Sequence, residues 1–166
     1  MHCDKKKNYM MYHKALLFND TAMASEILAE PSPQATRSLG RRVTPFSDET
    51  WAANRERIVT QASILKFSHP VSEDGFRRGN GEGAAELPAG AEGNGGGRLR
   101  AALLETGERE IVEASPRDRI WGVGFGAKNA GGRREKWGMN LLGKALMEAR
   151  RTLREEGEGV ETAKEE

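Results

Sequence analysis

Hydrophobic residues recur at helical spacing in three long segments of the chain. Residues 9–18 are apolar on nearly every side, which predicts a buried helix. Residues 48–66 and 139–153 each place their apolar positions along one stripe, with charged residues mostly off it. The pattern therefore predicts three main helices that bury apolar faces against one another.

Shorter helices are predicted from local start and stop signals. Asp20 is expected to cap a helix that carries Met23, Ile27 and Leu28, and Ser32-Pro33 resembles the N-cap and first residue of another, which Gly40 ends. Ser47 or Asp48 caps the helix over residues 48–66, and residues 99–105 form a short helix that Gly107 ends.

Two segments lack the apolar residues that folding needs. Residues 73–98 are rich in glycine and are expected to form a disordered insertion in a surface loop. Residues 155–166 are mostly glycine and glutamate and are expected to form a disordered tail. One domain over residues 8–154, interrupted by the insertion, is the resulting prediction.

The stretch from Thr106 to Gly126 contains several residue types that often have special structural or functional roles. Ile111 and Val112 suggest a brief strand, which Ser115-Pro116 breaks, and residues 127–136 are expected to form a polar loop. A carboxylate (Asp118), a large aromatic residue (Trp121) and alternating glycines follow the break. Such a group fits a small-molecule pocket, and it equally fits a tight turn closed by a buried tryptophan.

Composition narrows the class of protein. The chain of 166 residues has 31% charged residues and a net charge of +1, so its overall charge does not attract nucleic acid or a membrane surface. It has one cysteine, Cys3, so no internal disulfide forms. Three scattered histidines lack metal-ligand spacing, so no metal and no cofactor are expected. No leader or membrane span is visible, and an intracellular, cytoplasmic location is expected. The sequence does not specify an oligomeric state.

Short motifs in one order along the chain resemble the NADAR family, the YbiA-like N-glycosidases. They are Tyr9, Met10, Met11, Lys14, Ala15, Phe18 and Asp20; Leu39, Gly40 and Arg41; Trp51 and Arg55; Lys66 and Phe67; Leu104, Thr106 and Gly107; Glu113, Ser115, Pro116, Asp118, Trp121, Gly122 and Gly124; Asn140, Gly143, Met147 and Arg150. The resemblance covers about Tyr9 to Leu153 apart from the insertion.

The resemblance implies an α+β class, a mainly helical single domain with a few short strands. It also implies cleavage of N-glycosidic bonds at a ribose anomeric carbon. The expected partner is a phosphorylated ribose-containing small molecule, such as a ribosylaminopyrimidine intermediate of riboflavin synthesis, or an ADP-ribosylated guanine base.

Cleavage of such a bond develops positive charge at the anomeric carbon, which a carboxylate stabilises or relieves by activating water. Asp118 is the first candidate because it matches the family's aspartate, and Glu113 is the second, although strand alternation could equally aim it at a structural partner. Trp121 stacks on the leaving base in this interpretation, or is a core tryptophan.

Lys14 lies within an apolar segment, so burial should lower its pKa. An amine with a lowered pKa can attack an opened sugar and form a Schiff base. The alternatives are that Lys14 holds a phosphate, pairs with Asp118, or extends its charge to the surface.

The remaining candidates concern binding. Gly122 and Gly124 would let backbone amides approach a phosphate. Asn140 either donates to a ligand or caps the last helix. Arg150 is interpreted as a surface or salt-bridge residue.

One position departs from the family pattern. The family glutamate two residues before the motif tyrosine is replaced by Lys7, and the family's longer front region is not part of this sequence. The chain is therefore expected to be either a truncated or a degenerate copy. The alternative to an active glycosidase is a catalytically impaired protein that binds ADP-ribose or a related nucleotide.

Overall fold

The computed structural model describes residues 5–68 and 95–162, which fold mainly into helices and contain no strand. The main helices are α1 (Lys5–Leu17), α2 (Thr21–Ala29), α3 (Pro33–Arg42), α4 (Asp48–Ser68), α6 (Gly95–Leu104) and α8 (Leu141–Thr162). A short α7 (Ala127–Ala130) and a 3-10 helix, η1 (Gly131–Lys136), lie in the connection before α8. The mainly helical prediction is confirmed, whereas the few short strands of the α+β class are not among these residues.

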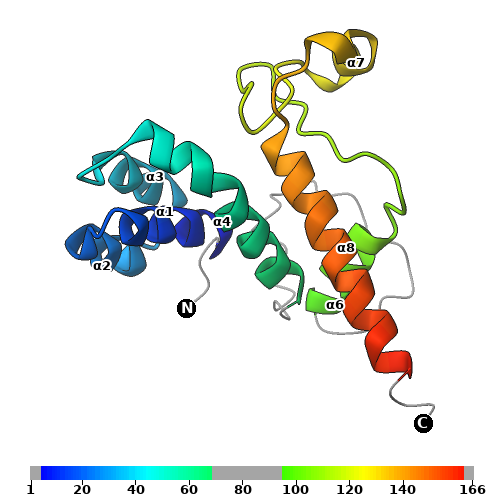
Figure 1. The fold of residues 1–166 in the computed structure, drawn as a ribbon, viewed down its shortest axis with the longest axis horizontal. Coiled ribbons are helices and arrows are strands. Elements are labelled where there is room, and N and C mark those ends of the chain that lie inside the picture. The colour runs from blue at the N-terminus through cyan, green and yellow to red at the C-terminus, as the bar shows by residue number, and fades with distance from the viewer. Residues whose placement is uncertain (1–4, 69–94, 163–166) are drawn as a thin grey trace.

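Helix α4 runs between two groups of helices (Figure 1). On one side it packs against α1, which also contacts α2 and α3; on the other it packs against α8 and α6. Each side has its own hydrophobic cluster. Ala15, Phe18, Met23, Ala24, Ile27 and Val43 are buried in the first, and Leu103, Ala149 and Leu153 are buried in the second.

Three side chains cap helices as their positions predict. Asp20 Oδ1 accepts from the N–H of Met23 at 3.1 Å, and Ser32 Oγ accepts from that of Ala35 at 3.3 Å. Ser47 Oγ accepts from the N–H of Thr50 at 3.2 Å, which makes Ser47 rather than Asp48 the cap of α4. Each bond satisfies an N–H group that the first helical turn would otherwise leave unpaired.

Gly40 does not end its helix. Helix α3 continues to Arg42, and Gly40 is buried within it. A Cβ at this position would lie 2.0 Å from Met11 Sδ. The glycine is therefore needed because α1 and α3 approach closely there, a tertiary cause that a local stop signal does not reveal.

Other boundaries also differ from the predictions. Most of the predicted insertion, residues 69–94, lies outside the described residues, but α6 begins at Gly95, before the predicted Leu99. Residues 127–136, predicted as a loop, form α7 and η1. Helix α8 continues to Thr162, so the part of the predicted disordered tail before residue 163 is helical. Arg151 pairs with Glu148 and Glu155 on this helix, a spacing that supports helix formation.

The predicted strand at Ile111 and Val112 is wrong. These residues belong to an irregular segment without a ladder partner. Instead, the Asn140 side chain donates to Ile111 O at 2.9 Å and accepts from the N–H of Glu113 at 3.0 Å. One amide side chain thus makes two of the hydrogen bonds that a neighbouring strand would supply.

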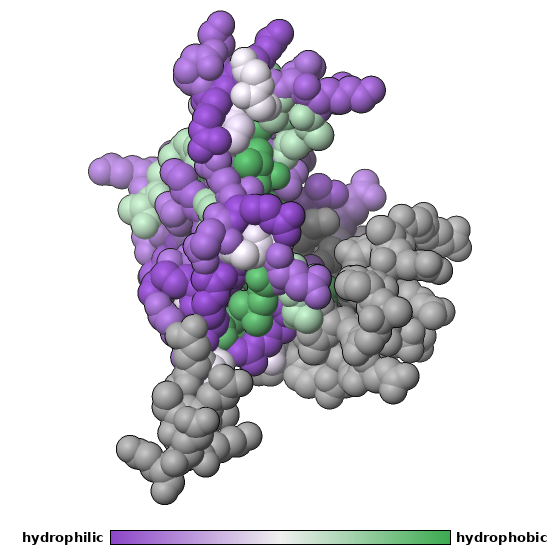
Figure 2. All heavy atoms as spheres, turned by 90° about the vertical axis from the view of Figure 1, so that its right-hand side faces the viewer, coloured by the Kyte–Doolittle hydropathy of each residue, from purple (hydrophilic) through white to green (hydrophobic). Residues whose placement is uncertain are grey.

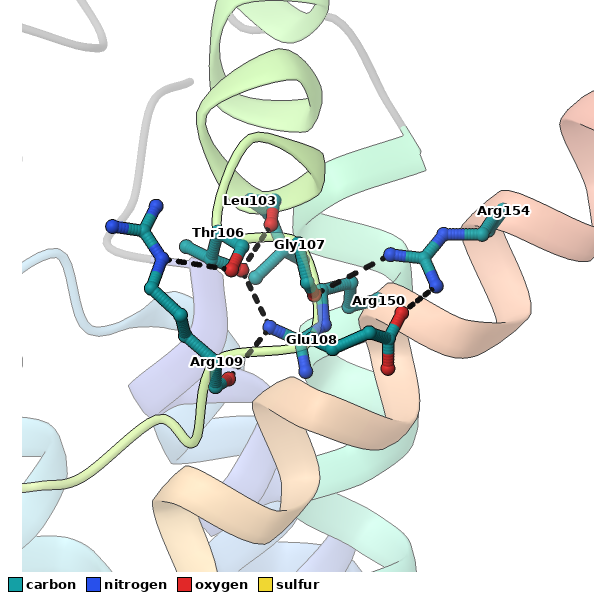
Figure 3. A network of polar contacts seen from close by, with 7 residues as sticks. All are labelled: Leu103, Thr106, Gly107, Glu108, Arg109, Arg150 and Arg154. Atoms are coloured by element: carbon teal, nitrogen blue, oxygen red, sulfur yellow. Dashed lines mark hydrogen bonds and ion pairs between the residues drawn. The ribbon is translucent and has the colours of Figure 1, made fainter.

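Arg150 holds the turn that follows α6 (Figure 3). Its exposed fraction is 5%, and Nη1 donates to Thr106 Oγ1 at 2.7 Å and to Arg109 O at 2.9 Å. Arg154 reaches Glu108 and Gly107 O from the next turn of α8. The interpretation of Arg150 as a surface or salt-bridge residue is wrong, because it is a buried donor to a turn.

Arg150→Met is expected to lower the free energy of unfolding by about 2 kcal/mol, since it leaves two acceptors unpaired while keeping the apolar stem. Urea denaturation measures this loss. The matched control is Arg151→Met, one residue along the same helix, where the exposed guanidinium has only surface partners and little change is expected. Equal losses in the two variants would contradict the role given to Arg150.

The face that α8 presents is mostly hydrophilic (Figure 2). Hydrophobic residues gather there in small, separate patches, and polar side chains cover the tip above the start of α8. Among the described residues, no helix is both long and apolar enough to cross a membrane.

Candidate functional site

Lys14 projects from α1 into a partly buried corner formed by α3 and the start of α4. Its Nζ donates to Gly40 O at 2.7 Å. The same nitrogen lies 4.1 Å from the ring centroid of Phe46 and 5.8 Å from that of Trp51. Aromatic faces attract a cation but do not hydrogen-bond it as water does, so the corner positions the amine while removing part of its hydration.

This environment lowers the pKa of Lys14 below its ordinary value. The main cause is burial, which disfavours the charged ammonium, and the nearby charge of Asp48 opposes it. The expectation of a lowered pKa is confirmed. The alternative in which Lys14 pairs with Asp118 is not realised: within residues 8–68 and 99–157, Nζ hydrogen-bonds to a backbone carbonyl and forms no ion pair.

Asp118 organises the loop in which it lies. Its Oδ1 accepts from the N–H groups of Ile120 at 2.9 Å and Trp121 at 2.8 Å. The other carboxylate oxygen makes no hydrogen bond within the described part of the chain. The half-buried side chain therefore has a structural role at one oxygen and keeps the second available to a ligand.

The loop from Arg119 to Trp121 in turn caps α8. The N–H groups of Leu141 and Leu142 donate to Ile120 O at 3.1 Å and Trp121 O at 3.0 Å. The positive end of the helix is thereby paired with carbonyl oxygens. Trp121 itself is half-buried, so part of its ring remains accessible for stacking.

The two glycines after Trp121 are required by close packing. A Cβ on Gly122 would lie 2.6 Å from Glu113 O, and one on Gly124 would lie 2.7 Å from Arg119 Cγ. Gly124 also has a φ of +80°, a conformation that favours glycine. Loop packing therefore accounts for both glycines, and phosphate binding by their amides stays a prediction.

Asn140 connects Glu113 to the start of α8. It is 5% exposed, and its side chain donates to Ile111 O and accepts from the N–H of Glu113. The side chain therefore does not cap α8, and its role as a ligand donor stays a prediction. The Glu113 side chain is half-buried, and its Cγ lies beside Gly122.

The predicted site residues thus form two groups. Glu113, Asp118, Trp121, Gly122, Gly124 and Asn140 belong to the loop cluster at the start of α8, whereas Lys14 belongs to the corner of α1, α3 and α4. No hydrogen bond or ion pair joins Lys14 to either candidate carboxylate among the described residues.

Helix α4 lies between these groups and adds residues to which the sequence analysis gave no role. Trp51 faces Lys14, and Arg55, one helical turn later, contacts Met139 beside Asn140, with Nη2 3.5 Å from the sulfur. The four-residue spacing of Trp51 and Arg55 in the sequence was the available signal, because it places both on one helix face.

No cluster of three or more potential metal ligands of the His, Cys, Asp and Glu types occurs in the described ranges. The chemistry that the two groups offer is that of an amine with a lowered pKa, two carboxylates and accessible aromatic faces. This combination defines a class of mainly helical domain with candidate groups for binding a small polar molecule.

Comparison with known proteins identifies the family within that class. Residues 1–154 match the NADAR domain, so the chain belongs to the NADAR family, and the resemblance inferred from its motifs is confirmed.

Three relatives illustrate the similarity. N-glycosidase R617 of Acanthamoeba polyphaga mimivirus is 39% identical over 146 residues, which cover 87% of this chain and 71% of that protein. Protein irg-1 of Caenorhabditis elegans is 30% identical over 151 residues, covering 89% and 59%. N-glycosidase YbiA of Escherichia coli is 26% identical over 142 residues, covering 86% and 67%.

Proposed function

We propose that the chain is an N-glycosidase that hydrolyses the bond between a ribose anomeric carbon and the nitrogen of a base or amine. Family membership and relatives named N-glycosidases support this activity. The observation that carries it in this molecule is the Lys14 amine, held at Gly40 O in a corner that lowers its pKa.

In the proposed reaction, the neutral Lys14 amine attacks the anomeric carbon. The carbon–nitrogen bond breaks, and the base leaves with a proton from the attacking amine. The bond from the anomeric carbon to the ring oxygen then breaks, the ring oxygen takes a proton from water, and a protonated Schiff base to Nζ forms. Water then adds to the same carbon, and hydrolysis of the Schiff base releases the sugar and restores the amine.

The loop cluster supplies the remaining groups in this proposal. The Asp118 oxygen that makes no hydrogen bond to a described residue stabilises positive charge at the anomeric carbon or accepts a proton from water, and Glu113 is the second candidate for either task. Trp121 stacks on the leaving base. Trp51 and Arg55, one turn apart on α4, contact Lys14 and Met139 respectively, so the proposed ligand lies along this face of α4 and reaches both groups.

The proposed substrates come from the resemblance. They are a phosphorylated ribosylaminopyrimidine of riboflavin synthesis and an ADP-ribosylated guanine base. Incubating the chain with each and following the free base by chromatography tests the activity and separates the two substrates. Failure to release base from either would contradict the proposed function.

Asp118→Asn is expected to lower kcat by about 10²–10⁴-fold, because the change removes the charge but keeps Oδ1 as an acceptor for the loop. Steady-state base release measures the loss. Glu110→Gln is the matched control, since this carboxylate lies nearby in the chain and pairs with Arg134 at the surface. Asp118→Asn activity equal to that of the control would remove Asp118 from the chemistry.

The alternative is a protein that binds ADP-ribose without cleaving the glycosidic bond. Lys7 in place of the family glutamate favours it, as does the use of one Asp118 oxygen by its own loop. Calorimetry that detects ADP-ribose binding by a chain that releases no base would support this alternative. Absence of binding heat would count against it.

A further inference from the structure

Arg55 is a cation with no carboxylate partner in the part of the chain that the structure describes. It lies on α4, and its Nε is buried with no hydrogen-bond partner. Among residues 8–68 and 99–157, its one hydrogen bond as a donor runs from Nη2 to Met139 Sδ at 3.5 Å, and a thioether sulfur is a weak acceptor. Among the described residues, Arg55 forms no ion pair with a carboxylate.

This arrangement is unusual because buried polar groups are normally paired and a guanidinium carries five N–H donors. The rest of the residue is half-buried, so part of the guanidinium remains accessible. Met139, its neighbour, is 48% exposed, and an incoming anion can displace its flexible side chain. The geometry is that of a partly desolvated cation next to a movable apolar cover.

Arg55 lies near residues of both groups of the proposed site. Trp51 lies one turn earlier on the same face of α4, and its ring is 5.8 Å from Lys14 Nζ. Met139 precedes Asn140, which holds Glu113. Arg55 therefore stands between the lysine corner and the loop cluster, where a group attached to the sugar would extend.

We infer that Arg55 binds a phosphate attached to the ribose of the ligand. A guanidinium fork matches the oxygens of a phosphate in geometry and charge better than any other side chain does. This inference deepens the proposed function, since it assigns a residue to the charge of the ligand. The phosphate is either a monoester, as in ribose 5-phosphate, or a diphosphate, as in ADP-ribose.

The test compares ligands that differ in phosphate, using calorimetry on the full chain with ribose, ribose 5-phosphate and ADP-ribose. The chain is expected to bind at least one phosphorylated ligand about ten- to a hundredfold more tightly than ribose, the gain of a charge-assisted contact. Whichever of the two gains more identifies the monoester or the diphosphate as the recognised group.

Variants then assign that preference to Arg55. Arg55→Gln is expected to abolish it, whereas Arg55→Lys keeps part of it because the charge remains without the fork. Arg57→Gln is the matched control, because Arg57 lies on the same helix, is exposed, and donates to Asn54 Oδ1 as its one hydrogen bond among the described residues. Met139→Leu should also keep the preference, since the sulfur is displaced on binding.

Two outcomes would overturn the inference. The first is a preference for phosphate that survives in Arg55→Gln or is absent from the unaltered chain. The second is a parallel loss of ribose and phosphate binding with a lower melting temperature in both Arg55 variants, which would make Arg55 a structural residue. The base-release assay is separate, so a chain that prefers phosphate but releases no base would reject the glycosidase and retain the Arg55 site.

Discussion

Lys14→Met is expected to reduce kcat for base release by a factor on the order of 10³ or more, because the proposed Schiff base forms on the Lys14 amine, which the change removes. Methionine keeps the apolar length of the side chain but loses the hydrogen bond to Gly40 O and the contact with the Phe46 ring. Steady-state kinetics measures the loss, and a melting curve confirms that the variant is folded. Lys144→Arg, an exposed lysine on α8, is the control.

Two further measurements distinguish a nucleophile from a lysine that only binds. Borohydride added during turnover should reduce the Schiff base and leave the sugar on Lys14, detectable by mass spectrometry. Lys14→Arg should bind ligand without becoming labelled. A fully active enzyme that yields no adduct would exclude the covalent route and favour direct attack by water with carboxylate assistance.

The pH dependence follows from the sign of the pKa shift. Only the neutral amine attacks, so the rate should rise with pH, and its midpoint should lie below the ordinary lysine pKa of 10.5 because burial lowers the pKa of Lys14. Asp48 raises that pKa, so Asp48→Asn should move the midpoint to lower pH. A midpoint that moves upward would contradict the electrostatic description of the corner.

Local signals predicted the front of the molecule well. The caps at Asp20, Ser32 and Ser47 depend on residues within three positions of one another, so the sequence alone contains the whole interaction. The lowered pKa of Lys14 was also predictable, because an apolar helix has few ways to hydrate an internal amine. The sequence could not reveal that the amine donates to the carbonyl of Gly40 or that aromatic rings lie around it.

The errors arose where the partner is distant in the chain. Gly40 was interpreted as a stop signal because its real partner, Met11, lies on another helix. Arg150 looked like a surface residue because its acceptors lie across the turn after α6. The short segment at Ile111 has the composition of a strand, but its hydrogen bonds go to one side chain, Asn140, which pattern analysis does not detect.

Separation along the chain also limits what the sequence predicts about the candidate site. The family motif identified Asp118 and Trp121 as separate candidates, and it did not predict that the Asp118 carboxylate accepts from the Trp121 amide. It could not predict that the loop also caps α8, because that depends on how the chain returns to Leu141 and Leu142. Roles for Asp118, Glu113 and Trp121 in catalysis stay predictions until the variants are assayed.

Gly143→Ala is expected to destabilise the protein, although alanine has a higher helix propensity than glycine. A Cβ at Gly143 would lie 2.1 Å from Ile111 O and 2.4 Å from Asn140 Nδ2, and it would separate two groups that now hydrogen-bond. Overpacking of this kind costs about 1–3 kcal/mol, and the lost bonds add to it. We expect a net loss of about 2 kcal/mol in unfolding free energy after the gain of about 1 kcal/mol from alanine's helix propensity.

The control is the same substitution farther along the same helix. At Gly157 a Cβ would meet only the end of the flexible Arg100 side chain, at 3.4 Å, so Gly157→Ala should stabilise by up to about 1 kcal/mol. Urea denaturation of the two variants should therefore give opposite signs. If Gly143→Ala also stabilised the protein, Asn140 would not hold the Ile111–Glu113 segment tightly. If the signs are opposite, Gly143→Ala should reduce base release as well, because the change displaces Glu113 from the start of α8.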